Sequence, residues 1–271
     1  TLRGMAEPGS VITIYDGIDP IGQTSANANG DWEITVEVPL TSGARDLRAT
    51  ATDASGNVSI DILLSVVIDT EAATLAAPDL AGTSDTGRSQ TDNITSNSTP
   101  TITGSGAESG AAITLLASNG TTVLGTATAD VSGSWSITST ELPAGSHNLS
   151  VKQTDLAGNV SSISAALMVT VDLSTTAPII SSASISADPM PTLTGTAEAG
   201  ALVAILNSAG AQLGTAFANG AGLWTYQFAS PLNEGINSFS VIATDIAGNT
   251  STTTATTIQV DSPGIKGSNG S

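Results

Sequence analysis

The sequence predicts an all-β fold: a tandem array of three antiparallel β-sandwich domains. One observation is a motif, Thr-Asp-x-x-Gly-Asn, that begins at Thr52, Thr154 and Thr244. A motif that recurs at domain spacing indicates an array of one domain type. The other observation is hydrophobic alternation of period two, without any helical stripe. We therefore expect domains over residues 1–70, 71–173 and 174–263 and a flexible tail over residues 264–271.

Strands are expected where apolar and polar residues alternate. Alternation runs from Trp32 to Val38 and from Leu47 to Thr52 in the first repeat, and from Trp224 to Phe228 in the third. It directs one row of side chains into a core and the other into solvent. Turn sequences such as Asn29-Gly30 separate the runs, as in antiparallel sheets. We expect about seven short strands in each repeat.

The opening strand of the first repeat is expected to be truncated. The repeat begins at Leu2, without the run that Thr99–Thr103 and Pro191–Thr194 supply in the other repeats. One tryptophan precedes each copy of the motif at a nearly constant distance. These tryptophans head alternating runs, so we expect them to pack in the cores, with sugar stacking as the alternative.

The second repeat is expected to carry an insertion. Successive tryptophans are 103 residues apart in the first interval and 89 in the second. The extra residues fall near positions 84–97, a polar stretch that contains Asp85 and Asp92. Such composition is also typical of a disordered linker. Asp, Asn, Thr and Ser are all oxygen donors, however, which favours an ordered loop.

Composition excludes several functions. The chain has 271 residues and no cysteine, which excludes disulfides and thiolate chemistry. Six Lys and Arg against 24 Asp and Glu give a net charge of −18, which disfavours nucleic acid and anionic membranes as partners. No apolar run approaches the 18 residues of a membrane span, so membrane insertion is not expected. The amino terminus is unlike a signal peptide, and we expect a segment of a longer protein.

An enzyme is not expected. The single histidine, His147, has no counterpart in the other repeats, and no nucleophile elbow accompanies it. Acidic residues recur at the same position in every repeat, which is typical of structure rather than of catalysis. Pairs of acids suited to glycoside hydrolysis are not excluded by spacing alone.

Several motifs together resemble the bacterial immunoglobulin-like repeats of giant adhesins. They are the Thr-Asp-x-Ala-Gly-Asn loop, the Gly-x-Ala-Glu segments at Gly4–Glu7 and Gly195–Glu198, and the link from Val171 to Pro178. The resemblance covers residues 1–263. In the first repeat, Ser55 departs from the motif. The resemblance implies immunoglobulin-like sandwiches in an RTX-type adhesin, exported by type I secretion to the extracellular bacterial cell surface.

The resemblance also implies calcium sites, and the chemistry of the acidic residues agrees with it. In an immunoglobulin-like sandwich, stacking domains end to end brings groups from two repeats together. The junction of repeats 1 and 2 is expected to collect Glu7, Asp69, Asp155 and Asn159, and that of repeats 2 and 3 to collect Glu108, Asp172, Asp245 and Asn249. Hard oxygen ligands suit Ca²⁺, which takes six to eight of them. Turn capping by aspartate alone is the alternative.

Further ligands are expected outside the two junctions. Asp85 and Asp92 resemble a second calcium site of the longer repeats in this family. Asp53 and Asn57 are expected to face a preceding repeat, and Glu198 with Asp261 a following one.

The expected function is that of a calcium-rigidified extender, or stalk, of a secreted bacterial surface adhesin that supports cell adhesion or biofilm formation. Its partners would be neighbouring repeats of the same chain, with any surface, host-cell or biofilm ligand bound elsewhere in the parent protein, and the chain itself would be a monomer. One alternative is an immunoglobulin-like module that grips a glycan or protein. Another is an ancillary module of a secreted polysaccharide-degrading enzyme.

Overall fold

The computed structural model describes residues 1–182 and 184–261, so the expected tail at 264–271 lies outside the described residues. All regular structure in the described part is β-strand, which confirms the predicted fold class. Among the described residues, there is no helix long and apolar enough to span a membrane. The chain divides into two compact units, which we describe one at a time. The first comprises Thr1–Ala73 with Thr154–Ser161, and the second the remainder.

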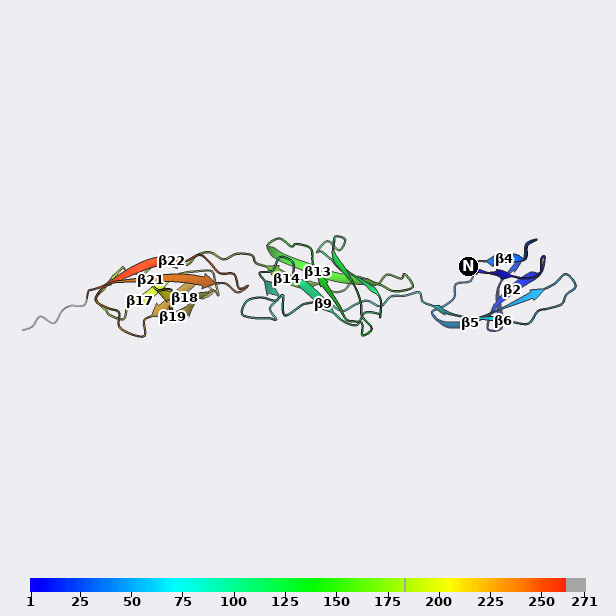
Figure 1. Cartoon of the computed structure of the whole chain (residues 1–271), viewed down its shortest axis with the longest axis horizontal. Helices are drawn as coiled ribbons and strands as arrows, with labels where there is room; N and C mark the ends of the chain where they lie inside the picture. Colours follow the sequence, from blue (N-terminus) through cyan, green and yellow to red (C-terminus); the bar gives the residue numbers. More distant parts are fainter. Residues whose placement is uncertain (183, 262–271) are drawn as a thin grey trace, which may run out of the picture. The chain divides into compact units, whose positions relative to one another are not determined.

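The first unit contains a sandwich of two sheets (Figure 1). Strand β1 (Leu2–Met5) pairs with β4 (Asp31–Ile34), and the second sheet has the order β3-β2-β5-β6. The bounds of the latter strands are Val11–Asp16 for β2, Asp19–Ser25 for β3, Gly43–Thr52 for β5 and Ile62–Ile68 for β6. β4 is shorter than the expected run to Val38, because its partner β1 has only four residues.

The second unit begins with a more complete sandwich. Its sheets have the orders β12-β9-β7 and β11-β10-β13-β14-β8. The strands are β7 (Asp79–Leu80), β8 (Ile94–Thr95), β9 (Thr101–Gly104), β10 (Ala112–Leu116), β11 (Val123–Thr128), β12 (Trp135–Thr138), β13 (Gly145–Thr154) and β14 (Leu167–Val171). One segment therefore contributes β7 to one sheet and β8 to the other, where β8 lies parallel to β14.

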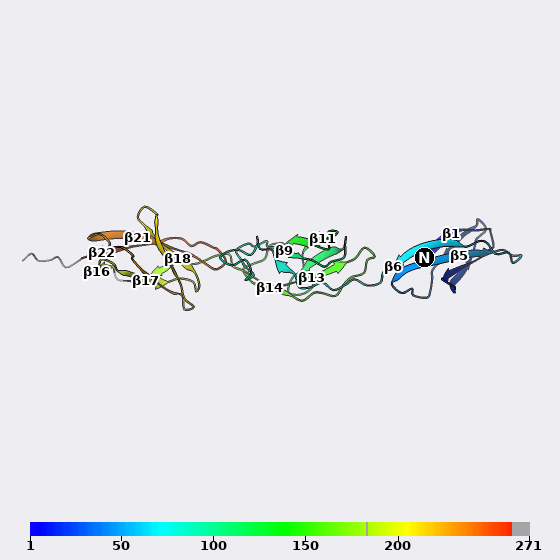
Figure 2. The same cartoon turned by 90° about the horizontal axis from the view of Figure 1, so that it is seen from below.

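The third sandwich repeats this plan with the orders β15-β17-β20 and β16-β22-β21-β18-β19. Its strands are β15 (Ile179–Ile180), β16 (Ile185–Ser186), β17 (Thr192–Thr196), β18 (Leu202–Asn207), β19 (Gln212–Phe217), β20 (Leu223–Gln227), β21 (Gly235–Thr244) and β22 (Thr254–Val260). β16 lies parallel to β22, as β8 does to β14. Within the second unit the two sandwiches follow one another along its length (Figure 2).

The missing strand of the first sandwich differs from the one expected. β1 is the counterpart of β9 and β17, because Gly4 pairs with Trp32 as Gly104 pairs with Trp135. The prediction that this strand is truncated was wrong, because β1 has four residues, as many as β9. Among the described residues, the first repeat lacks a counterpart of β7 with β8, or of β15 with β16. Sequence alternation could not separate these strands, since β7, β8, β15 and β16 have only two residues each.

Tryptophan and glycine meet at the same place in every sandwich. A Cβ added to Gly104 would overlap the ring of Trp135, so only glycine lets the ring lie flat on the strand. Trp135 and Trp224 are buried in their cores, which confirms the packing prediction for these two. Trp32 is half-buried and packs against the smaller core of the first sandwich.

Candidate metal centre

The loop from Asp245 to Asn249 closes on its own side chains. The Asn249 backbone N–H donates to Asp245 Oδ1, and its side-chain Nδ2 donates to Oδ2, both at 2.8 Å. Gly248, at a φ of 93°, permits the turn between them. The loop starts where β21 ends, and a bridge from Thr244 to Thr250 fixes its base. Asp245 is thereby held at 1% exposure.

Three carboxylates meet at this loop. Asp172, Glu198 and Asp245 each offer an oxygen, and these oxygens lie within 4.8 Å of one another. Thr175 Oγ1 donates to Glu198 Oε2 at 3.0 Å. Asn249 Nδ2 also donates to the Asp172 carbonyl oxygen at 2.8 Å, so this amide joins the link between sandwiches to the loop. We call this set of donations from one asparagine the Asn bracket. It orients the Asp245 carboxylate and holds the Asp172 backbone beside it.

Strand pairing explains why Glu198 joins the cluster. Leu202 of β18 pairs with Thr244 of β21, so the turn before β18 and the loop after β21 lie at the same end of the sandwich. The expectation that Glu108 would join Asp172 and Asp245 was wrong, because it placed the Glu-x-Gly turn at the opposite end. Asp261 also lies away from Glu198, since it follows Val260, whose partner Gly235 begins β21.

The other two Glu-x-Gly turns also lie at the end of their sandwich that carries the Thr-Asp-x-x-Gly-Asn loop. Glu108 exchanges hydrogen bonds with Gln153: its N–H donates to Gln153 Oε1 at 3.0 Å, and Gln153 Nε2 donates to its Oε1 at 3.3 Å. In the first sandwich, Val11 pairs with Thr52, so the Glu7 turn lies at the end that carries Asp53. The prediction that Glu7 would meet Asp69 was therefore wrong, since Asp69 follows β6 at the other end.

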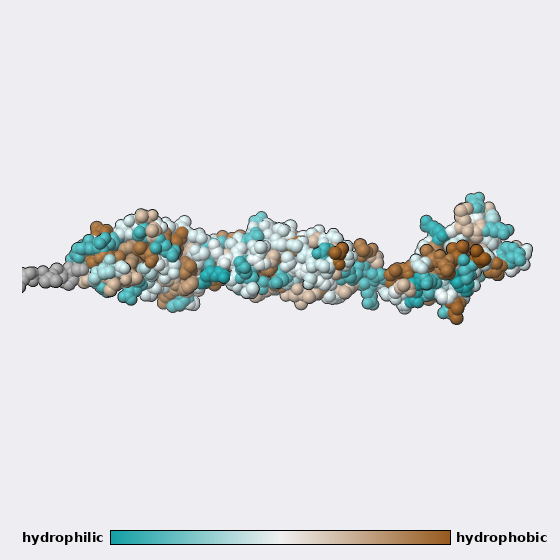
Figure 3. Space-filling model, turned by 60° about the horizontal axis from the view of Figure 1, so that its bottom comes forward, coloured by the Kyte–Doolittle hydropathy of each residue, from teal (hydrophilic) through white to brown (hydrophobic). Residues whose placement is uncertain are grey.

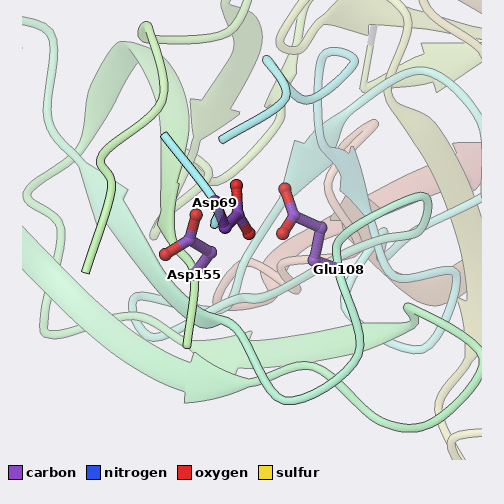
Figure 4. Close-up of side chains that lie close together, drawn as sticks. All are labelled: Asp69, Glu108 and Asp155. Atoms are coloured by element: carbon purple, nitrogen blue, oxygen red, sulfur yellow. The ribbon is translucent and has the colours of Figure 1, made fainter. Parts of the chain in front are cut away.

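The first unit contains a second copy of the bracket, whose Asp69 and Asp155 side chains are labelled in Figure 4. Asn159 Nδ2 donates to Asp155 Oδ2 at 2.7 Å and to the Asp69 carbonyl oxygen at 3.1 Å. Carboxylate oxygens of Asp69 and Asp155 lie within 4.8 Å of each other. Figure 4 also labels Glu108, a residue of the second unit.

Hydrogen bonds keep Asp155 ionised. Its burial alone would raise the pKa of Asp155, but donation from the side chain and backbone of Asn159 and from the backbone of Gly158 and Ala157 holds that pKa below its usual range. The Asp53 loop has the same form: Asn57 donates to both Asp53 oxygens, chiefly through its side chain, and lowers the pKa of Asp53.

The donor set of the Asp172, Glu198 and Asp245 cluster fits a hard divalent cation. Each pair of like charges at this separation repels by about 1 kcal/mol in water and by about 3 kcal/mol in the medium typical of a protein surface. A buried carboxylate needs a partner to offset its lost hydration. All ligands offered are oxygens, which suits Ca²⁺ better than a transition metal.

The insertion places a second buried acid in the same unit. Asp85 is 2% exposed, and its Oδ2 accepts the Asn93 N–H at 3.1 Å. Its Oδ1 has no hydrogen-bond partner. Burial, and then the nearby Asp92, raise the pKa of Asp85. Asp92 Oδ1 accepts the Ile94 N–H at 3.2 Å. A buried oxygen without a partner is suited to a proton or a cation.

The insertion also contacts the third sandwich, which sequence reasoning missed. Thr86 Oγ1 donates to the Ala247 carbonyl at 2.6 Å, inside the Asp245 loop. Arg88 Nη2 donates to the Gly200 carbonyl at 2.5 Å, and its guanidinium lies 4.7 Å from the centre of the Phe217 ring. No sequence signal marks this contact, because its partners are backbone carbonyls 112 and 161 residues further along the chain.

Repeated sandwiches with acidic loops at their ends define the chain as a tandem β-sandwich repeat protein. A family described as "Bacterial Ig-like domain" matches residues 72–173 and 179–262, and one described as "Bacterial Ig domain" matches residues 1–67. The chain belongs to the bacterial immunoglobulin-like domain family.

Solved structures with similar folds come from several kinds of protein. A tetra-tandem repeat from the extending region of a large adhesion protein is 20% identical, with a TM-score of 0.36 over 96% of this chain and 70% of that one. Fibronectin(III)-like modules of Clostridium thermocellum CbhA are 17% identical, with a TM-score of 0.40 over 68% and 94%. The BSP domain of a biofilm associated protein is 14% identical, with a TM-score of 0.28 over 94% and 57%. Comparison with curated proteins gave no match.

Proposed function

We propose that the chain is a calcium-rigidified extender of a secreted bacterial surface adhesin, located outside the cell. The observation that carries this proposal is the cluster of Asp172, Glu198 and Asp245 between consecutive sandwiches. Asp172 comes from the link, while Glu198 and Asp245 come from the next sandwich. An ion bound by all three would therefore fix the link to the sandwich that follows it.

We extend the same proposal to the equivalent residues of the preceding repeats. Asp69, Glu108 and Asp155 occupy the sequence positions of Asp172, Glu198 and Asp245, and Asn159 that of Asn249. Glu7, Asp53 and Asn57 form the corresponding half-site at the start of the first sandwich, and Asp261 that of the link after the third. Asp85 and Asp92 are proposed to hold a separate ion within the insertion, which the unpartnered Asp85 oxygen supports.

A mechanical role needs no catalytic group. Trp135 and Trp224, the residues that a sugar-stacking site would use, are buried in their cores. Their burial supports the stalk over the glycan-binding alternative. Adhesion to a surface, a host cell or a biofilm, and export by the type I pathway, belong to this proposal as properties of the parent protein.

Calcium binding is the first test. After dialysis against millimolar calcium, bound-metal analysis of the full chain should find at least two ions, with dissociation constants of roughly micromolar to millimolar as for extracellular modules. Asp245→Ala should remove one ion and reduce the calcium-dependent rise in the melting temperature, because less ion binds to the native state.

Glu141→Ala is the matched control, since Glu141 is exposed and lies outside the acidic clusters. It should leave the ion count and the thermal response unchanged. A wild-type chain that binds no calcium at millimolar concentration would refute the proposal. An Asp245→Ala chain that keeps the full ion count would remove Asp245 from the ligand set.

A further inference from the structure

The insertion is a long connection between β7 and β8. It comprises residues 81–93, whereas residues 181–184 make the same connection in the third sandwich. A longer connection loses more conformational entropy when it becomes ordered, so contacts must offset that loss. Two groups of contacts do so: an acidic pair, Asp85 and Asp92, and a docking segment, Thr86–Arg88, which lies between the two acids.

The acidic pair closes the insertion on itself. Asp85 Oδ2 accepts the Asn93 N–H at 3.1 Å, and Asn93 has a φ of 59°, in the left-handed region where the chain can turn back. Asp85 is 2% exposed, its buried Oδ1 has no hydrogen-bond partner, and the Asp92 side chain lies beside it. Two carboxylates in this arrangement are unfavourable unless a cation lies between them.

The docking segment lies inside the ring that the acidic pair closes, and it contacts the third sandwich. Ser96 donates its backbone N–H to Thr86 Oγ1 at 2.7 Å, and the Ser96 hydroxyl lies 3.0 Å from the same oxygen. The Ala247 carbonyl can only accept, so Thr86 donates in the 2.6 Å bond between them. The single hydroxyl proton of Thr86 is therefore used on the third sandwich, where Ala247 is fully buried.

Docking reaches both loops of the third sandwich that carry acids of the cluster. Ala247 lies two residues after Asp245, and Gly200, whose carbonyl accepts from Arg88, lies two residues after Glu198. On the face drawn in Figure 3, most side chains of the second sandwich have intermediate hydropathy, so little apolar area is available there for an interface. The contact therefore depends on directed hydrogen bonds, and hence on the conformation of the insertion.

We propose that a divalent cation held by the acidic pair and the docking of Thr86–Arg88 on the third sandwich stabilise each other. This coupling rests on the proposed function, in which the insertion holds its own ion. An ion bound by both carboxylates fixes the two ends of the docking segment, so less conformational entropy remains to be lost on docking. The coupling is reciprocal, so docking strengthens ion binding by the same factor. An ion inside the second sandwich thereby stiffens its junction with the third.

Amide hydrogen exchange in the full chain tests the effect of the ion on docking. The loop from Asp245 to Asn249 should exchange about fivefold faster in Asp85→Ala than in the wild type at saturating calcium, a factor at the lower end of typical couplings. In chelator the two chains should exchange equally, because neither holds the ion. Asp79→Ala is the matched control: it removes an exposed acid just before the insertion and should change nothing in either condition.

A double-mutant cycle tests whether Asp85 acts through docking. In Gly87→Ala the added Cβ would overlap the Ile246 carbonyl oxygen, which blocks docking. Adding Asp85→Ala to this variant should not accelerate exchange of the Asp245 loop any further. Any ion at the cluster of Asp172, Glu198 and Asp245 is available to all four chains, so its contribution cancels.

The reciprocal effect is measured without changing the acidic pair. The Asn93 N–H donates to Asp85, so its NMR resonance reports calcium binding at this site. Thr86→Val, which removes the donation to Ala247, should weaken that binding by up to about fivefold. Thr86→Ser keeps the hydroxyl and should retain the affinity of the wild type.

Three outcomes would overturn the coupling. They are equal exchange of Asp85→Ala and the wild type in calcium, a difference that is equally large in chelator, and acceleration by Asp85→Ala that persists when docking is blocked. The second outcome would mean that Asp85 holds the insertion through hydrogen bonds or a shared proton. Bound-metal analysis separates these failures from failure of the proposed function: Asp85→Ala that keeps the full ion count refutes the insertion ion, whereas loss of one ion with unchanged exchange refutes the coupling alone.

Discussion

The Asp and Asn of the repeated motif form a side-chain bracket at all three copies. In each loop the asparagine donates both its backbone and its side-chain N–H to the aspartate four residues earlier. In two of the three, the same amide also reaches the carbonyl of the upstream link. The motif therefore orients a carboxylate, and in two of the three copies it joins that carboxylate to the preceding segment. The turn capping that the sequence suggested as an alternative is present at all three copies, and it holds the aspartates in place for the ion sites proposed above.

A related turn gives a prediction about pH. Asp130 Oδ1 accepts the Ser132 hydroxyl at 2.7 Å and the Ser134 N–H at 2.9 Å, and these bonds, led by the Ser132 hydroxyl, lower the pKa of Asp130. Because the folded pKa lies below the unfolded one, the stabilisation is present above the unfolded pKa and is lost as pH falls through the folded pKa. The carboxyl titration of Asp130, followed by NMR, should therefore have a midpoint below about 3.9.

The other repeats supply the control for this prediction. Asn219 occupies the same turn in the third sandwich, where its Oδ1 accepts the Ala221 and Leu223 N–H groups. Asp130→Asn should therefore keep the turn and remove the pH dependence that this carboxylate contributes. An Asp130 midpoint at or above that of a free aspartate would contradict the role of its hydrogen bonds.

At the scale of elements, direct hydrogen bonds from the insertion join the second and third sandwiches. Gly87 lies at a φ of 85°, and a Cβ there would overlap the Ile246 carbonyl oxygen. Thr86 and Arg88 on either side of Gly87 donate to the third sandwich. Only a glycine at this position lets the two backbones approach closely enough for both donations.

Gly87→Ala should therefore disrupt this contact. Hydrogen exchange in the loop from Asp245 to Asn249 should accelerate, because the loop loses the Thr86 bond and the insertion that covers it. The matched control is Gly106→Ala, since Gly106 also has a positive φ, 78°, but nothing within 4 Å of the added Cβ. Both variants share the backbone cost of about 1 kcal/mol. Equal exchange in the two variants would show that the contact contributes nothing.

The strands, the carboxylate cluster and the insertion differ in how well the sequence predicts them. Alternation and turn residues predicted the strands around Trp135 and Trp224 because these signals are local to each strand. The position of Glu198 depends on the register of β18 with β21, and the Thr86 contact on backbone carbonyls far along the chain. Neither leaves a periodic signal. The acidic residue types were visible in the sequence, but their grouping required the pairing of the strands.

At the scale of the whole molecule, two kinds of connection between sandwiches are proposed: direct hydrogen bonds and bound ions. The second and third sandwiches share a compact unit in which Thr86 and Arg88 of the insertion donate to backbone carbonyls of the third sandwich. The proposed junction of the first repeat with the second relies on ion ligands. We expect the second unit to loosen less in chelator than the junction of the first repeat with the second, because these hydrogen bonds remain when the ion proposed at Asp172, Glu198 and Asp245 is lost.

The sequence contains no cysteine, so introduced cysteines can be spin-labelled selectively. Distances between two such labels report how rigidly the sandwiches are connected. Thr121→Cys with Ala209→Cys spans the second and third sandwiches, and Thr121→Cys with Ile18→Cys spans the two units. The first pair should give a narrow distance distribution with calcium and should broaden less in chelator than the second pair, because the Thr86 and Arg88 contacts persist when the proposed ion is lost. The second pair should be narrow with calcium and broad with chelator, since domains without a large apolar interface move relative to one another by default. A broad first distribution in chelator would show that the insertion contact is too weak to join the sandwiches, and a second distribution insensitive to calcium would refute rigidification by the ion.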